Sequence, residues 1–150
     1  MSGASVSPAL TLPAAGTLWS RDACCKTPLR VTIHSHHLAA ILPVTGAIAT
    51  ASSTELLRLL REAVQQAGLD AVGDLATTFE PQGVSVVLIL KESHVALHVW
   101  PECNKVSVDI HVCDYHQNNL PKAENLAERL TLMLTGRRDR SGWSYLGLKG

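Results

Sequence analysis

The 150-residue sequence lacks an excess of charge of either sign. Its 13 Lys and Arg residues are matched by 13 Asp and Glu residues. Nucleic acids and anionic membranes attract basic surfaces, so this balance argues against both kinds of partner. The chain also lacks an apolar run approaching the roughly 20 residues of a membrane span. Its N-terminus lacks the basic start and long apolar core of a secretion signal. We therefore expect a soluble, unexported protein located in the cytoplasm.

The cysteines lack the spacing of a metal or redox site. The four are Cys24, Cys25, Cys103 and Cys113, and no two of them stand in a C-x-x-C arrangement. Adjacent Cys24 and Cys25 cannot readily bridge each other, and a chain of this length does not need disulfide staples. We expect all four to be free thiols in a reducing compartment.

What the sequence does have is apolar content, at 46% of its residues, which predicts a packed globule. The length suits one domain. Residues 1–28 are rich in Ser, Ala, Thr, Gly and Pro without a sustained period, which predicts a poorly ordered N-terminal extension. The domain is expected at residues 29–150.

Several segments have the composition or the alternating pattern of strands. Residues 95–100 and 105–113 alternate apolar and polar side chains and are joined by residues 101–104, a length suited to a hairpin. Residues 43–53 look like a connection. Strands are predicted, in chain order, at Leu29–Ile33, Asp70–Phe79, Val84–Leu90, Val95–Trp100, Lys105–Cys113 and Trp143–Leu146.

Two helices are expected from period and end signals. The first has Ser52 as its cap and Glu55 three residues on, and it ends near Gly68. Its apolar stripe consists of Leu56, Leu60, Ala63, Val64 and Ala67. The second has Pro121 in its first turn and ends near Gly136, and its stripe consists of Ala123, Leu126, Ala127, Leu130 and Leu134. The order of elements predicts an α+β fold, a two-layer α/β sandwich with an antiparallel sheet and both helices on one face.

The other sheet face would carry polar side chains able to do chemistry, namely His98, Trp100, Asp109, His111 and Cys113. A solvated face of a one-sided antiparallel sheet explains the same alternation. A metal site built from His34, His36 and His37 with His94, His98 or His111 has no defined ligand spacing. A Cys–His hydrolase built on Cys103 or Cys113 has no nucleophile elbow. These alternatives stay open on pattern alone.

Residues 79–113 carry a more specific signal, FEPQGVSVVLILKESHVALHVWPECNKVSVDIHVC. The segment resembles the prokaryotic type of S-adenosylmethionine decarboxylase proenzyme, a pyruvoyl-dependent enzyme of spermidine synthesis. The family pattern is F-x-P-x-G-V-S, then eight residues on to the Ser of E-S-H, then H-T-W-P-E and a V-D-V-x-x-C strand. Every one of these spacings is preserved here without a gap.

The resemblance implies that the chain cleaves itself between Glu92 and Ser93, giving a β chain of residues 1–92 and an α chain of residues 93–150. Ser93 would become a covalent pyruvoyl group, which forms a Schiff base with the substrate amine and accepts electrons on decarboxylation. By position, His98 matches the family's processing base and Ser85 the hydroxyl that assists processing. Cys113 matches the acid that reprotonates the product.

For the substrate, Phe79 matches the aromatic residue that stacks on adenine, and Glu102 matches the acid that holds ribose hydroxyls. Trp100 is placed with them as a substrate-binding residue. The resemblance implies no metal ligand. It implies a two-layer sandwich whose protomers pair sheet to sheet, hence a homodimer of processed αβ units.

Departures from the family pattern leave two further functions open. Asp114 stands where the family usually has Gly, Lys91 replaces the usual small residue, and RVTIHSHHLAAIL replaces the G-x-H strand. Asp114 could receive the distal cation of arginine or ornithine, so a decarboxylase of those amino acids is one alternative. A non-catalytic regulatory paralogue is the other. Retained Phe79 and Glu102 favour S-adenosylmethionine, and the intact cleavage and acid residues favour an enzyme.

Overall fold

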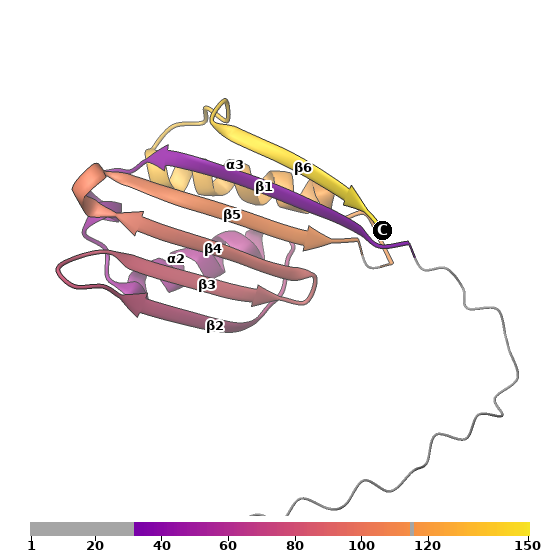
Figure 1. The fold of residues 1–150 in the computed structure, drawn as a ribbon, viewed down its shortest axis with the longest axis horizontal. Coiled ribbons are helices and arrows are strands. Elements are labelled where there is room, and N and C mark those ends of the chain that lie inside the picture. The colour runs from indigo at the N-terminus through magenta and orange to yellow at the C-terminus, as the bar shows by residue number, and fades with distance from the viewer. Residues whose placement is uncertain (1–31, 115) are drawn as a thin grey trace, which may run out of the picture. The chain divides into compact units, whose positions relative to one another are not determined.

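The computed structural model describes residues 32–114 and 116–150, in which six strands form one open antiparallel sheet. The expected N-terminal extension, with Cys24 and Cys25, lies outside the described residues. The strand order across the sheet is β2-β3-β4-β5-β1-β6 (Figure 1). The strands are β1 (His34–Pro43), β2 (Ala71–Thr78), β3 (Val84–Leu90), β4 (Ser93–Trp100), β5 (Lys105–Cys113) and β6 (Trp143–Lys149).

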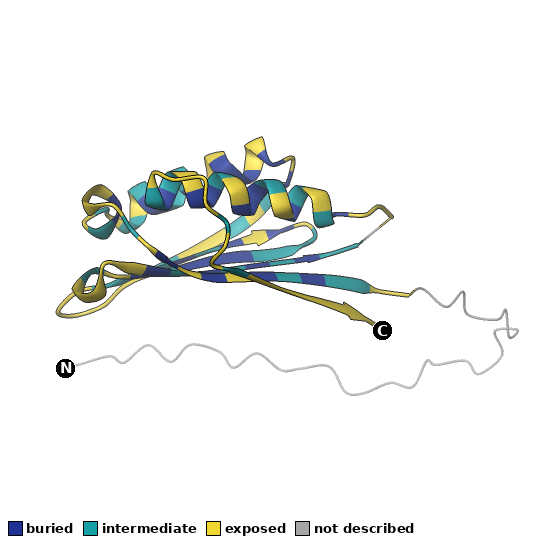
Figure 2. Cartoon of the chain, turned by 90° about the horizontal axis from the view of Figure 1, so that it is seen from above, coloured by how far each residue is buried: buried dark blue, intermediate teal, exposed yellow. Residues whose placement is uncertain are grey.

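The two long helices, α2 (Ser53–Gln66) and α3 (Leu120–Thr135), cover the same face of this sheet (Figure 2). A short helix, α1 (Gly46–Ala49), precedes α2, and a 3-10 turn, η1 (Pro101–Cys103), joins β4 to β5. This arrangement is the predicted two-layer α+β sandwich. None of the described helices is long and apolar enough to span a membrane.

The core lies between the helices and the sheet because both contribute one apolar side. Strands β4 and β5 alternate, so every second side chain points toward the helices. Those inward side chains are buried, as are the helix residues that meet them. The fully buried large side chains include Leu56, Leu60, Leu88, Val95, Leu97, Val106, Ile110, Leu126, Leu130 and Leu134.

Both helices begin and end at the predicted signals. The Ser52 hydroxyl accepts a hydrogen bond from the Glu55 N–H at 3.2 Å, which satisfies one free donor of the first turn. Gly68 and Gly136 follow α2 and α3 with positive φ angles of 78° and 70°, which glycine adopts without a steric penalty.

Five segments differ from the sequence-based expectation, among them β2, which is Ala71–Thr78 and so one residue shorter at each end than predicted. Residues 29–31 of the predicted strand Leu29–Ile33 lie outside the described residues, and the first described strand is His34–Pro43. In this strand His36 takes a buried position, where an apolar pattern would have an aliphatic residue. The expected connection at residues 43–53 contains α1. This helix has only four residues, which is too short to show a helical period in the sequence. Strand β4 begins at Ser93, two residues early, and β6 continues to Lys149. The extra residues of β4 pair with β5, and the extra residues of β6 pair with β1.

Candidate active site

The connection between β3 and β4 contains only Lys91 and Glu92. Lys91 is held by Asp70, whose backbone carbonyl accepts from the Lys91 N–H at 3.0 Å and whose carboxylate accepts from Nζ at 2.8 Å. The Glu92 carbonyl accepts a hydrogen bond from the Cys113 N–H at 3.0 Å. Within the described residues the Glu92 Oε2 atom is buried and has no hydrogen-bond partner. The peptide bond from Glu92 to Ser93 therefore lies in a tight, anchored hairpin next to an unpaired acid oxygen.

A cluster of hydroxyl, imidazole and thiol groups surrounds the Ser93 side chain, and we call Ser35, Ser93, His94, His111 and Cys113 the Ser93 cluster. The Ser93 Oγ atom lies 2.8 Å from His111 Nδ1 and 3.3 Å from His94 Nδ1. On its other side, His111 Nε2 lies 2.8 Å from Ser35 Oγ and 3.6 Å from Cys113 Sγ. Pairing of β5 with both β1 and β4 brings these side chains together.

Burial lowers the pKa of His111 below its ordinary value of 6.5. Charge on the neighbouring His37 and His94 lowers this pKa further, and Asp109 opposes the shift. His37 stacks on the His111 ring with centroids 3.9 Å apart, and His94 approaches edge-on at 5.2 Å. At neutral pH the His111 imidazole is therefore uncharged and keeps a nitrogen lone pair available.

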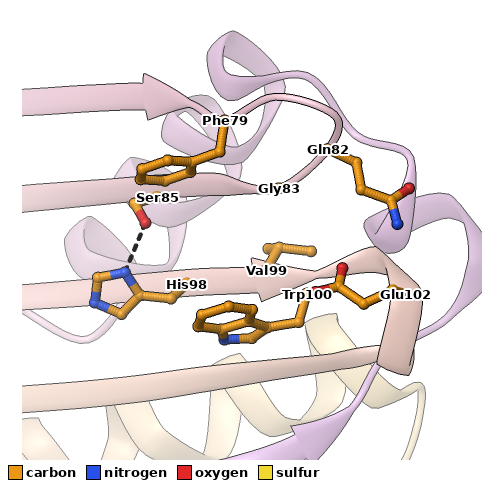
Figure 3. Close-up of a pocket in the computed structure, with 8 residues that line it drawn as sticks. All are labelled: Phe79, Gln82, Gly83, Ser85, His98, Val99, Trp100 and Glu102. Atoms are coloured by element: carbon orange, nitrogen blue, oxygen red, sulfur yellow. Dashed lines mark hydrogen bonds between the residues drawn. The ribbon is translucent and has the colours of Figure 1, made fainter.

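A pocket of about 390 Å³ lies at the other end of β4 (Figure 3). Within it, the Ser85 hydroxyl and His98 Nδ1 form a hydrogen bond of 2.7 Å across the β3–β4 pair. Figure 3 shows the Phe79 ring beside Ser85 and the Trp100 indole beside His98, with the Glu102 carboxylate at the η1 end. We call this the Ser85–His98 pocket, and its lining residues are Phe79, Gln82, Gly83, Ser85, His98, Val99, Trp100 and Glu102.

One chain does not bring all of the predicted site residues together. Ser93 and His98 lie five positions apart on the same strand, so their Cα atoms are roughly 16 Å apart at about 3.3 Å per residue. Glu92, Ser93 and Cys113 belong to the Ser93 end. The predicted residues at the pocket end are Phe79, Ser85, His98, Trp100 and Glu102.

The sequence pattern did not place Gln82 or Gly83 in a pocket, and it did not place Ser35 or His111 beside Ser93; it indicated His111 only on the polar sheet face and as a candidate metal ligand. A signal for His111 was present, because residues two apart on a strand share a face and His111 precedes Cys113 by two. Ser35 had no comparable signal, since the strand that carries it was placed too early in the chain.

Two histidines of the metal alternative, His36 and His37, have other partners in the structure. His36 accepts from the Tyr145 hydroxyl at 2.9 Å and donates to Asp114 at 3.1 Å. His37 lies against the His111 ring. Across residues 32–114 and 116–150, no three His, Cys, Asp or Glu side chains are grouped as metal ligands. Cys113 contacts an imidazole, but it lies at the end of a strand without the sharp turn of a nucleophile elbow.

The comparisons with known proteins agree on one family. A family model described as S-adenosylmethionine decarboxylase matches residues 32–135. The S-adenosylmethionine decarboxylase proenzyme of Aeropyrum pernix is 38% identical over 79 residues, which are 53% of this chain and 60% of that protein. The proenzyme of Symbiobacterium thermophilum is 40% identical over 60 residues, 40% of this chain and 46% of that protein. The matches thus span about half of the length of these two relatives.

Other relatives match over more of their length. The S-adenosylmethionine decarboxylase proenzyme of Acetivibrio thermocellus is 33% identical over 94 residues, 63% of this chain and 75% of that protein. Among solved structures, the adenosylmethionine decarboxylase of Aquifex aeolicus matches with a TM-score of 0.60 and 25% sequence identity. That match covers 78% of this chain and 89% of the other.

Proposed function

Because the chain belongs to the S-adenosylmethionine decarboxylase family, we propose that it is a self-cleaving proenzyme that becomes a pyruvoyl-dependent S-adenosylmethionine decarboxylase. Its product would be decarboxylated S-adenosylmethionine, the aminopropyl donor for spermidine synthesis. The observation that carries this proposal is the anchored Glu92–Ser93 hairpin, in which the Ser93 hydroxyl has an imidazole 2.8 Å away and the Glu92 carbonyl accepts from the Cys113 N–H.

Cleavage would begin with attack of the Ser93 Oγ on the Glu92 carbonyl carbon, which replaces the amide by an ester. The Cys113 N–H is placed to stabilise negative charge on the carbonyl oxygen. Removal of the Ser93 Cα proton then releases the Glu92 carboxylate and leaves a dehydroalanine at position 93. Hydrolysis of that residue gives ammonia and the pyruvoyl group at the start of the α chain.

The residues around position 93 suit a pyruvoyl group, which when present accepts the electron pair left by the departing carbon dioxide. Cys113 lies within the Ser93 cluster, where its thiol can return a proton to the product carbon. His98 is the proposed base for removal of the Ser93 Cα proton, and the hydrogen bond from Ser85 orients its ring. His98, on β4, and Ser85, opposite it on β3, both lie in the Ser85–His98 pocket, away from Ser93 of the same chain.

A second copy of the chain would bring His98 and Ser93 together. Among the described residues, no helix or strand covers the sheet face opposite the helices (Figure 2). The exposed large apolar side chains of the sheet include those of Ile41, Leu75 and Ile89. Exposed apolar area of this kind favours a protein partner. If two sheets pair face to face with their β4 strands in opposite directions, His98 of one copy meets Ser93 of the other. We therefore propose a homodimer of processed αβ units with two shared sites.

The substrate would lie in the Ser85–His98 pocket. Phe79 offers a face for adenine, Glu102 an acceptor for ribose hydroxyls, and Trp100 an aromatic face that attracts the sulfonium cation. The arginine or ornithine alternative relied on Asp114 as a receptor for a distal cation. That carboxylate already accepts from His36 and from the Asn119 N–H, so the structure gives the alternative no support. We also propose a cytoplasmic location, to which the free thiols of Cys103 and Cys113 are suited.

Intact-mass measurement of the purified chain tests self-cleavage. We expect two chains, of residues 1–92 and 93–150, with a pyruvoyl group on the second, and a single uncut chain for Ser93→Ala. Carbon dioxide release from carboxyl-labelled S-adenosylmethionine, arginine and ornithine then tests the substrate. A parent chain that stays uncut would contradict the enzyme assignment and favour the regulatory paralogue.

Mixing two inactive variants tests the shared site. Neither Ser93→Ala nor His98→Ala is expected to be cut alone. When they are produced together, a mixed dimer pairs Ser93 of the His98→Ala chain with an intact His98, so that chain should be cut. If the His98→Ala chain stays whole in the mixture while mixed dimers form, each site lies within one chain and the shared arrangement is wrong.

A further inference from the structure

We propose that His111 is the base that takes the hydroxyl proton of Ser93 in the first step of self-cleavage, and that Ser35 positions the His111 ring for this step. This inference rests on the proposed function, since it concerns the same Glu92–Ser93 bond. It assigns the two histidines near the reaction to different steps. His111 would act in amide-to-ester conversion and His98 in the later elimination.

The hydrogen bonds of the Ser93 cluster give His111 the correct orientation. Ser93 Oγ is 2.8 Å from His111 Nδ1, which is closer than the 3.3 Å to Nδ1 of the adjacent His94. For Nδ1 to accept the Ser93 proton, the ring must carry its own proton on Nε2. Ser35 Oγ lies 2.8 Å from Nε2 and can accept from it. The Ser35 hydroxyl can then donate to His37 Nε2 at 3.2 Å, which completes the network.

The surroundings of His111 keep its imidazole in the neutral, accepting form. His37 from β1 stacks on the ring, His94 from β4 meets it edge-on, and Asp109 and Cys113 flank it on β5. Partial burial lowers the pKa of His111, and the two histidine neighbours lower it further. A base that is uncharged at neutral pH and in contact with the nucleophile meets both requirements of general base catalysis.

The step balances without any outside reactant. The Ser93 hydroxyl proton passes to His111 Nδ1 while the Oγ–C bond to the Glu92 carbonyl carbon forms. The carbonyl electron pair moves onto its oxygen, which the Cys113 N–H holds. The carbonyl double bond then re-forms as the bond between the Glu92 carbonyl carbon and the Ser93 nitrogen breaks. The Ser93 nitrogen keeps that electron pair and takes the proton from His111. An amide has become an ester with a free amine, and His111 is regenerated.

A pulse of cell-free synthesis of the full chain, followed by intact-mass analysis over time, measures the cleavage rate. We expect His111→Phe, which keeps a ring to stack on His37, to slow cleavage by about 100-fold or more. The matched control is His34→Phe on β1, outside the Ser93 cluster, and it should change the rate by less than about threefold. Ser35→Ala should slow cleavage by roughly tenfold, and Ser35→Thr, which keeps the hydroxyl, should restore the rate.

Two further readouts separate lost chemistry from lost folding. Added imidazole should accelerate cleavage of His111→Ala, because it can enter the space of the missing ring. Hydroxylamine, which cuts esters, should split the His98→Ala chain at position 92 but leave His111→Phe whole, because only the former reaches the ester. A hydroxylamine-sensitive His111→Phe chain, or one cut at the parent rate, would overturn the role of His111. An uncut parent would instead overturn the proposed function itself.

Discussion

Asp114 is expected to contribute to stability rather than to substrate choice. Its Oδ1 atom accepts from the Asn119 N–H at 2.8 Å and from His36 Nε2 at 3.1 Å. Asn119 is fully buried and His36 is 8% exposed, so water cannot easily replace the lost acceptor. Hydrogen bonds to a charged group contribute about 1.5–3 kcal/mol each. Because the Asp114 side chain is 22% exposed, we take the lower part of that range.

On this reasoning Asp114→Ala should lower the free energy of unfolding by about 3–4 kcal/mol, or the midpoint temperature by about 10 °C. The assay is urea denaturation followed by circular dichroism, at equal protein concentrations and in a Ser93→Ala background that keeps the chain whole. The matched control is Asp139→Ala, since exposed Asp139 accepts from the Ser141 N–H in a surface turn. Its loss should cost less than about 0.5 kcal/mol.

The effect of Asp114 should also depend on pH. Burial tends to raise the pKa of Asp114, but the Asn119 N–H and His36 outweigh it and hold that pKa below its ordinary 3.8. A lowered pKa stabilises the folded state at pH values above 3.8, and this stabilisation is lost as the pH falls through the lowered pKa. The gap between parent and variant should be constant from pH 7 to 5 and narrow below about pH 4. If the unfolding free energies of the parent and Asp114→Ala differ by less than about 0.5 kcal/mol at neutral pH, the stabilising role of Asp114 is wrong. A change of substrate without loss of stability would contradict it as well.

Three other changes give distinct outcomes. Cys113→Ala keeps the backbone N–H that donates to the Glu92 carbonyl, so this variant should still be cut. Its kcat should fall by about 100-fold or more because the thiol that returns a proton to the product is missing. Full activity would contradict the role proposed for the Cys113 thiol. Phe79→Ala should raise KM for S-adenosylmethionine by roughly tenfold through lost stacking, with cleavage by intact mass unchanged; an unchanged KM would place adenine elsewhere. Because the pKa of His111 is lowered, the parent's cleavage rate should hold through pH 6.5 and fall only at lower pH, where His111 takes up a proton. A rate that does not change down to about pH 4 would exclude a histidine base.

The sequence predicted the elements in which period and end signals coincide. Strands β3 and β5 were predicted with their observed bounds, and both long helices lie where their caps and glycines indicated. Strand β1 was missed because His36 is buried at an inward position. Its partners Tyr145 and Asp114 are far away in the sequence, so no local pattern identifies it as a core residue.

The site was predicted as a set of residues but not as an arrangement. Motif spacing makes Ser85, Ser93, His98 and Cys113 candidates, but it does not give the distances between them in space. The strand rise separates Ser93 from His98 within one chain. The contact of His111 with Ser93 depends on the register of β4 against β5, and the alternation of side chains along each strand does not specify that register.

The order of strands across the sheet decides how firmly the two fragments of a cleaved chain would stay together. The proposed cut after residue 92 would assign β1, β2 and β3 to one fragment and β4, β5 and β6 to the other. Strand β1 then lies between β5 and β6 of the other fragment, and β3 still pairs with β4. The fragments interdigitate along three strand edges and can part only by dismantling the sheet. Separated fragments would have to meet by diffusion to rebuild the sheet. If the proposed cut occurs, we therefore expect it to follow folding, and we expect the cut protein to refold less readily than the uncut chain.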